Sequence, residues 1–169
     1  VLFRSSLLEL IQDFRPEDRI SFSGWDRRNA IPDEVTLIHH PRGDVKKISF
    51  DANPAIENNG VQYGGLNPFF IPADHSYFSI FNEVGTNDFG IFERGSSGCG
   101  WFNQEQRIVG TQIGGNLPFS CDNEELWGTG GRLNLSWEGN GTPDSRLRDW
   151  LGASTNPNTM DCMEHPFIE

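Results

Sequence analysis

The chain has no cluster of lysine and arginine and no long apolar run. Its 13 basic residues are outnumbered by 24 acidic ones, which gives a formal net charge of -11. A nucleic-acid-binding surface needs grouped basic side chains, so a nucleic-acid partner is not expected. A membrane-spanning helix needs roughly 20 apolar residues in a row, and no segment approaches that length. The acidity favours a soluble protein.

Cysteine is scarce, with only Cys99, Cys121 and Cys162 in 169 residues. Their spacings match no zinc-binding pattern, so we expect no metal site and no cofactor. An odd number leaves at least one thiol unpaired within the chain. Cys121 could pair with Cys162, or its partner could lie upstream of Val1.

Repeats and low-complexity segments are also absent, and the composition favours one folded domain. Hydrophobic residues make up 36% of the chain and aromatic residues 12%, which argues against disorder. The 19 glycines and 10 prolines separate many short apolar runs. This arrangement is typical of an all-β fold with many turns.

Alternating or compact apolar runs predict short strands followed by one helix. Strands are expected at residues 20–24, 35–39, 47–50, 77–81, 89–92 and 132–137. A hairpin is expected from residues 101–102 and 107–113, ending at two glycines.

The helix is expected to start after Thr142 and to carry one apolar stripe from Leu147, Trp150 and Leu151. We assign residues 1–153 to one domain and residues 154–169 to a polar tail that wraps the surface or frays.

The segment ERGSSGCGWF (residues 93–102) contains two serines among three glycines. By itself this pattern is more typical of a flexible surface turn than of a reactive loop. A serine hydroxyl is a poor nucleophile at its free pKa and needs a base within hydrogen-bond reach. The surrounding sequence therefore decides whether the segment is reactive.

Several segments in a fixed order carry a family resemblance. They are LLEL (7–10), SGWDRRN (23–29), IHHPRGDVKKIS (38–49), GSSGCGWFNQEQRIVG (95–110), GG (114–115), GR (131–132), SW (136–137) and LRDWL (147–151). With these segments the chain resembles the trypsin-fold serine endopeptidases of the bacterial lysyl endopeptidase type, over nearly its whole length.

The resemblance implies two β-barrels with an active site between them. This chain corresponds to the second, a six-stranded antiparallel barrel with a C-terminal helix. The catalytic histidine would lie upstream of Val1, so the N-terminal barrel becomes an expected partner and the chain an expected fragment, inactive alone. The family also implies a secreted bacterial protein.

The same resemblance assigns roles to individual residues. Ser97 matches the reactive serine, and the backbone N–H groups of Gly95 and Ser97 match the oxyanion hole. Gln112, Ile113 and Gly114 match the segment that pairs with a peptide or protein substrate.

Three positions depart from the family. Arg4 stands where the catalytic aspartate is expected, and an arginine cannot accept the imidazole N–H. Cys99 and Gly100 replace a small residue and proline, and we interpret Cys99 as a small buried residue. Gly128 occupies the substrate-binding position that holds an aspartate in lysine-specific relatives, which leaves the side-chain preference open.

None of the four histidines is expected to replace the missing base. His39 and His40 belong to the IHHP segment, with one in the core and the other bonded to a loop. His75 and His165 lie in expected loops without an evident carboxylate partner. Three functions stay open: a serine endopeptidase, a catalytically inactive homologue that binds peptides or partners, and a non-functional gene fragment.

Overall fold

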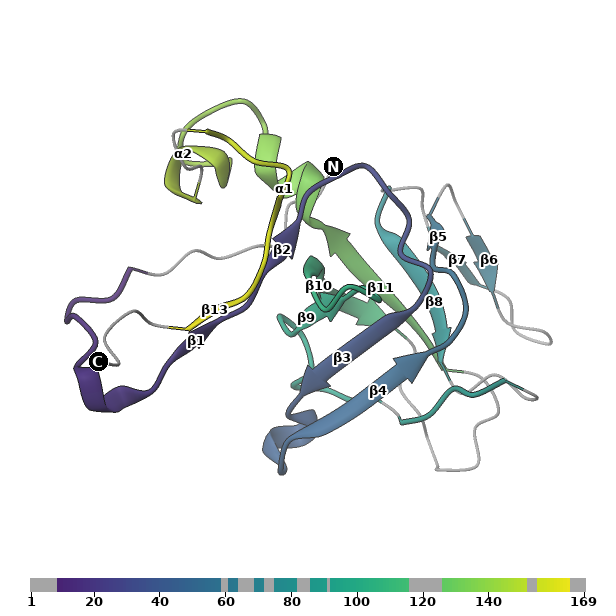
Figure 1. The fold of residues 1–169 in the computed structure, drawn as a ribbon. Coiled ribbons are helices and arrows are strands. Elements are labelled where there is room, and N and C mark those ends of the chain that lie inside the picture. Colours follow the sequence, from purple (N-terminus) through teal and green to yellow (C-terminus); the bar gives the residue numbers. More distant parts are fainter. Residues whose placement is uncertain are drawn as a thin grey trace.

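The structure, a computed structural model, describes residues 9–58, 61–63, 69–71, 75–81, 86–90, 92–115, 126–151 and 155–164. Figure 1 shows that most strands gather in one curled body, from which an arm extends. Helices are few and short. The all-β class expected from the sequence is therefore confirmed.

Among the described residues, nine strands belong to one sheet. They are β2 (Trp25–Asp26), β3 (Val35–His39), β4 (Lys47–Asp51), β5 (Ile56–Glu57), β8 (Tyr77–Phe81), β9 (Gly100–Phe102), β10 (Ile108–Gly115), β11 (Leu126–Arg132) and β12 (Thr159–Met160). Two further pairs are β1 (Ser21–Phe22) with β13 (Met163–Glu164), and β6 (Val61–Tyr63) with β7 (Phe69–Ile71). The helices are η1 (Pro16–Asp18), η2 (Pro41–Gly43), α1 (Leu133–Glu138) and α2 (Arg148–Leu151).

The main sheet runs in the order β4-β3-β9-β10-β11-β8-β5, and neighbouring strands on this path are antiparallel. The sheet curls until β4 and β8, which are not paired strands, come into contact. Ser79 on β8 donates a hydrogen bond of 2.6 Å to the Asp51 carboxylate on β4. Six strands from β4 to β8 thus form the expected antiparallel barrel.

The hairpin predicted around the polar turn at residues 103–106 is confirmed by β9 and β10. Thr111 pairs with Gly100, and Gly110 pairs with Trp101. On its other side β10 pairs with β11, with a bulge between Gln112 and Gly114. A bulge bends a strand and increases its twist, so it contributes to the curl of the sheet.

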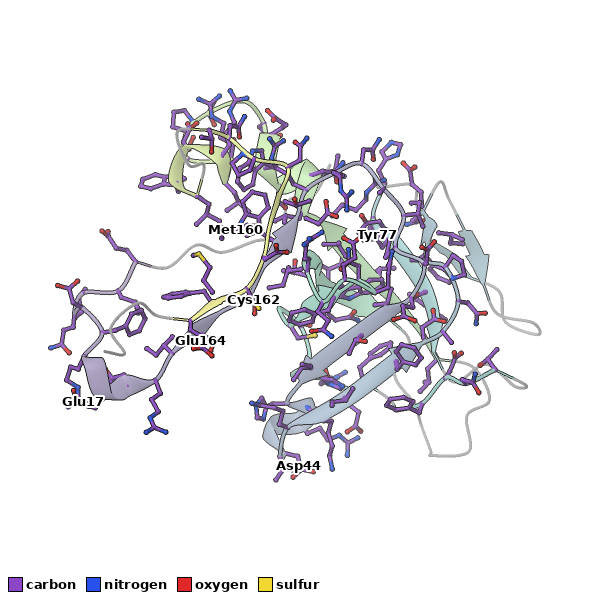
Figure 2. All side chains as sticks on the ribbon, in the orientation of Figure 1. Glu17, Asp44, Tyr77, Met160, Cys162 and Glu164 are labelled. Carbon is purple, nitrogen blue, oxygen red and sulfur yellow. The ribbon has the colours of Figure 1, made fainter. Side chains whose placement is uncertain are left out.

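Trp101 lies at the centre of the barrel core and is fully buried. Its ring stacks against Tyr77 with 6.1 Å between the ring centroids. The backbone of Gly130 approaches so closely that an added Cβ would lie 2.7 Å from the indole ring. In Figure 2, the side chain of Tyr77 is labelled within this densely packed part of the molecule. Close packing of this kind leaves little room for extra volume.

The two ends of the described chain pair with each other, and β2 joins them to barrel strand β10. β1 pairs with β13, and β2 pairs with β12. Figure 2 shows Glu164 on this arm, whereas Cys162 is labelled between the arm and the barrel. Residues 155–164 thus lie along the N-terminal strands β1 and β2. The assignment of residues 154–169 to a separate tail stays a prediction.

The prediction of a strand at residues 132–137 is wrong. Only Arg132 belongs to a strand, and the next six residues form α1. The alternation of Leu133, Leu135 and Trp137 matches a strand period. In the helix the two buried residues are the neighbours Ser136 and Trp137. Gly139 ends the helix at a φ of 53°, with its N–H bonded to the Leu135 carbonyl.

The C-terminal helix starts later than expected, because Ser145 holds residues 142–145 in a turn. Its hydroxyl lies 2.9 Å from the Thr142 hydroxyl and donates to the Thr142 carbonyl at 3.0 Å. Local side-chain bonds of this kind compete with helix formation. The helix α2 has four residues, and the expected stripe is not buried: Trp150 and Leu151 are both exposed.

A strand expected at residues 89–92 is present in the described residues only as a single bridge between Phe89 and Phe50. None of the described helices has the length and apolar character that crossing a bilayer requires.

We expect Gly130→Ala to destabilise the barrel, because the new methyl group would enter the space of the Trp101 ring. Overpacking of a filled core costs about 1–3 kcal/mol. Gly131→Ala is the matched control, since its added Cβ meets nothing closer than 3.5 Å. Urea unfolding of both variants tests this packing, and equal stability of the two would contradict it.

The contact between β4 and β8 predicts a pH-dependent stability. Burial raises the pKa of Asp51, so the folded protein favours the protonated carboxyl. The carboxyl therefore lowers stability progressively as pH rises from its unfolded pKa through its raised folded pKa. Asp51→Asn removes the charge, and its amide can still accept from the Asn53 N–H and donate to the Ser79 hydroxyl. Its stability relative to the parent should therefore be more favourable at pH 7 than at pH 4. Urea unfolding at the two pH values measures this difference, with the surface change Asp13→Asn as control.

Candidate active site

The segment from Glu93 to Cys99 forms two tight turns before β9. Gly95 and Gly98 have φ angles of 94° and 89°, in a region that side chains other than glycine rarely adopt. At Gly95 an added Cβ would also lie 3.2 Å from the Arg42 nitrogen. We call residues 93–99 the serine loop.

Backbone hydrogen bonds hold the serine loop through the N–H groups of Ser96, Gly98 and Cys99. The N–H of Ser96 bonds to the Glu93 carbonyl at 3.1 Å, and the N–H of Cys99 bonds to the Ser96 carbonyl at 3.2 Å. The N–H of Gly98 bonds to the Gln112 carbonyl on β10 at 2.8 Å. Within the described part of the chain, the N–H groups of Gly95 and Ser97 have no acceptor.

The two serines of the loop have opposite environments. Ser97 is exposed, and its hydroxyl has no hydrogen-bond partner among the residues that the structure describes. Ser96 is 2% exposed, and its hydroxyl lies 2.7 Å from Nδ1 of His39. Only Ser97 is therefore accessible to a substrate.

The described histidines all have partners other than Ser97. His39 is buried and lies between Ser96 and Ser49, whose hydroxyl is 3.0 Å from Nε2. His40 is exposed and bonded to the Asp44 carbonyl at 3.0 Å. This pair confirms the expectation of one core histidine and one bonded to a loop.

His75 has a carboxylate partner that the sequence did not indicate. Its Nδ1 lies 2.7 Å from Oε1 of Glu57, 18 residues earlier in the chain. The expectation of no partner was therefore wrong for His75. His165 lies outside the described residues.

Gln112 connects the serine loop to the core. Its buried side chain accepts a hydrogen bond of 2.8 Å from the Trp101 indole and donates one of 2.6 Å to the Gly114 carbonyl. Its backbone N–H bonds to the Cys99 carbonyl at 2.9 Å. Substrate contact through Gln112 stays a prediction, but its side chain and its N–H already have partners.

The end of β10 is more open than its middle. Gly114 pairs with Thr129 and Gly115 with Gly128, both on β11. On the opposite side the pairing with the β9 segment ends at Gln112, and no described strand continues it. Ile113 lies at the bulge and is half-buried.

Gly128 is buried within β11 and pairs with Ser79 as well as with Gly115. Ser79, the cross-strand partner of Gly128, also bonds to the Asp51 carboxylate. A buried carboxylate is therefore bonded to the residue that pairs with Gly128. This proximity could not be read from the sequence, because Asp51 and Ser79 are 28 positions apart.

The cysteines carry no reactive signature. Cys99 is half-exposed and packs against the core, and burial raises the pKa of its thiol to about 11. The thiol is therefore protonated at neutral pH and a poor nucleophile. Cys162 is a free, exposed thiol, so the suggested disulfide with Cys121 is not formed. Arg4 and Cys121 lie outside the described residues.

No group of three or more His, Cys, Asp or Glu side chains that could hold a metal ion occurs among the described residues. The chemistry available at the serine loop is thus that of one exposed hydroxyl beside two free N–H groups.

A protein-family model described as "Lysyl endopeptidase, C-terminal domain" matches residues 4–127. The match covers more than half of the chain and includes the serine loop and all of β10. Gly128 lies one residue beyond it. The chain therefore belongs to the lysyl endopeptidase C-terminal domain family, a family of serine proteases, and its curled sheet is the C-terminal barrel of the trypsin-like fold.

Proposed function

We propose that this barrel supplies the nucleophile of a secreted serine endopeptidase, and that Ser97 is this nucleophile. The observation that carries the proposal is the pattern of free groups in the serine loop. The Ser97 hydroxyl and the N–H groups of Gly95 and Ser97 are unbonded within the described chain, while the intervening and following N–H groups are bonded. A hydroxyl beside two free amides is the arrangement that acyl transfer requires.

In the proposed reaction the Ser97 oxygen bonds to the carbonyl carbon of a peptide, and its proton passes to a base. The negative charge that develops on the carbonyl oxygen accepts hydrogen bonds from the N–H groups of Gly95 and Ser97. The C–N bond then breaks, and the base returns the proton to the leaving amine. Water hydrolyses the acyl-enzyme by the same route.

The base comes from a partner domain. No described histidine contacts Ser97, because each has other partners. The matching family model is that of a C-terminal domain, which supports an N-terminal barrel as the source of the histidine and aspartate. Alone, the described barrel holds the substrate and the nucleophile without the means to activate it.

The substrate is a peptide strand that pairs with the open side of Ile113 and Gly114. Strand addition uses main-chain hydrogen bonds, and it suits an edge that lacks a partner. Gly128 contributes no carboxylate, so this position does not favour a lysine side chain. The side-chain preference of this protein therefore stays open.

A catalytically inactive, peptide-binding homologue is the second candidate function. The observation that favours it is Arg4, which stands where the family's catalytic aspartate is expected and begins the matched segment. An arginine there would repel the imidazolium formed during catalysis. Under this alternative the same strand edge holds a peptide that is not cleaved.

A fluorophosphonate probe tests the nucleophile, applied to the protein that includes the preceding domain. We expect covalent labelling of the peptide that contains Ser97, identified by mass spectrometry, and its loss in Ser97→Ala. Ser21→Ala, which removes an exposed serine of β1, is the control and should be labelled like the parent. A folded protein that binds peptide but takes no label would favour the inactive homologue.

The oxyanion site predicts a specific effect of Gly95→Ala. The added Cβ is incompatible with the positive φ and would displace the Gly95 N–H from its place beside the Arg42 backbone. Loss of one such donor lowers kcat about 100- to 1,000-fold. We expect this loss in kcat with a smaller change in KM.

Gly141→Ala is the matched control, because Gly141 has a φ of 84° with open space around it and lies far from the serine loop in sequence. It should lower stability without lowering kcat. Similar kcat values for the two variants would argue against an oxyanion role for Gly95.

A further inference from the structure

We infer that His39 is a positioning residue for the proposed nucleophile, and that it acts through Ser96 to hold the serine loop in the form that exposes Ser97. The kinetic consequence rests on the proposed function. The structural part rests on contacts within this chain alone.

The imidazole of His39 joins three separate segments. It is the last residue of β3 and is 2% exposed. Nδ1 lies 2.7 Å from the Ser96 hydroxyl in the serine loop, and Nε2 lies 3.0 Å from the Ser49 hydroxyl on β4. Both ring nitrogens are therefore used inside the protein.

The hydrogen-bond partners of Ser96 give the bonds a direction. The Ser96 oxygen accepts from the Glu93 N–H at 3.2 Å. Its own proton has one acceptor among the described residues, Nδ1 of His39. A neutral imidazole that accepts at Nδ1 carries its proton on Nε2 and donates it to Ser49. Burial, assisted by the neighbouring His40, lowers the pKa of His39 and keeps this neutral form.

These hydrogen bonds hold the serine loop at Ser96. Ser96 stands between Gly95 and Ser97, the two residues whose N–H groups are free. When the Ser96 side chain is held inward by His39, the Ser97 side chain is left on the outside. The loop conformation thus depends on a buried contact 57 positions away in sequence.

Arg42, which lies between β3 and β4, makes two other contacts with the serine loop. The Arg42 N–H bonds to the Arg94 carbonyl at 2.7 Å, and the Arg42 side chain pairs with Glu93 at 3.0 Å. The Arg42 side chain is 72% exposed, and exposed ion pairs are screened by water and salt. The His39–Ser96 bond is the buried side-chain contact among these three.

Two substitutions at His39 separate positioning from packing. His39→Asn places its Oδ1 near the position of Nδ1 and can still accept from Ser96, although it leaves a larger void. His39→Gln fills more space and can place an amide near Ser49, but it loses the acceptor for Ser96. If His39 only fills space, His39→Gln should disturb the serine loop less than His39→Asn does. If His39 positions the loop, His39→Asn should disturb it less than His39→Gln does.

Amide hydrogen exchange at Ser96 and Gly98, whose N–H groups are hydrogen-bonded in the serine loop, is the first measurement, because it requires no catalysis. We expect about tenfold faster exchange in His39→Gln, as for loss of one buried hydrogen bond, and nearly parental exchange in His39→Asn. His40→Gln alters the adjacent exposed histidine and is the control; it should leave this segment unchanged.

Kinetics of the protein with its preceding domain are the second measurement. We expect His39→Gln to lower kcat about tenfold with little change in KM, and His39→Asn to restore most of it. Unchanged exchange in His39→Gln, or a better result for Gln than for Asn, would overturn the inference. Absence of labelling in the parent protein would instead count against the proposed function, since the exchange result does not depend on it.

Discussion

The buried amide of Gln112 is the contact on which the rest of the site depends. It accepts a hydrogen bond from Trp101 at the core and donates one to Gly114 at the open end of β10. Its backbone bonds to Gly98 and Cys99 of the serine loop. A buried polar side chain is stable only when its hydrogen bonds are satisfied, and here two different parts of the barrel satisfy them while the serine loop bonds to the Gln112 backbone. Core, loop and substrate edge are consequently held at fixed distances from one another.

That constraint explains how two adjacent serines acquire different roles. With the loop held at Gly98 and Cys99, the positive φ angles of Gly95 and Gly98 reverse the chain within four residues. One serine then faces the core and meets His39, and the next faces solvent. The glycines are thus required by the conformation, and the exposure of Ser97 follows from backbone bonds more than from any property of Ser97 itself.

The sequence predicted those features whose physical cause is local. β3 and the hairpin of β9 and β10 follow from alternation and from a polar turn, and the serine loop follows from its glycines. The helix α1 was missed because Leu133, Leu135 and Trp137 also fit a strand period. The pairs His39–Ser96, Asp51–Ser79 and Glu57–His75 could not be predicted, since they join residues 57, 28 and 18 positions apart. For the same reason the resemblance pointed to Ser97, whose role stays a prediction, and not to the residues that hold its loop.

In the proposed function the two barrels have different tasks, and the hydrogen bonds of the serine loop explain which task falls to this barrel. Every described hydrogen bond that shapes the serine loop comes from this barrel, so the loop does not need the preceding domain for its form. Under the proposed function, the proton acceptor comes from a preceding domain. Arg4, at the position expected for the acid that orients this acceptor, would then weaken activation without altering the hydrogen bonds that shape the serine loop. The proposal thus separates binding from cleavage, because the described strand edge and serine loop do not include the group that activates Ser97.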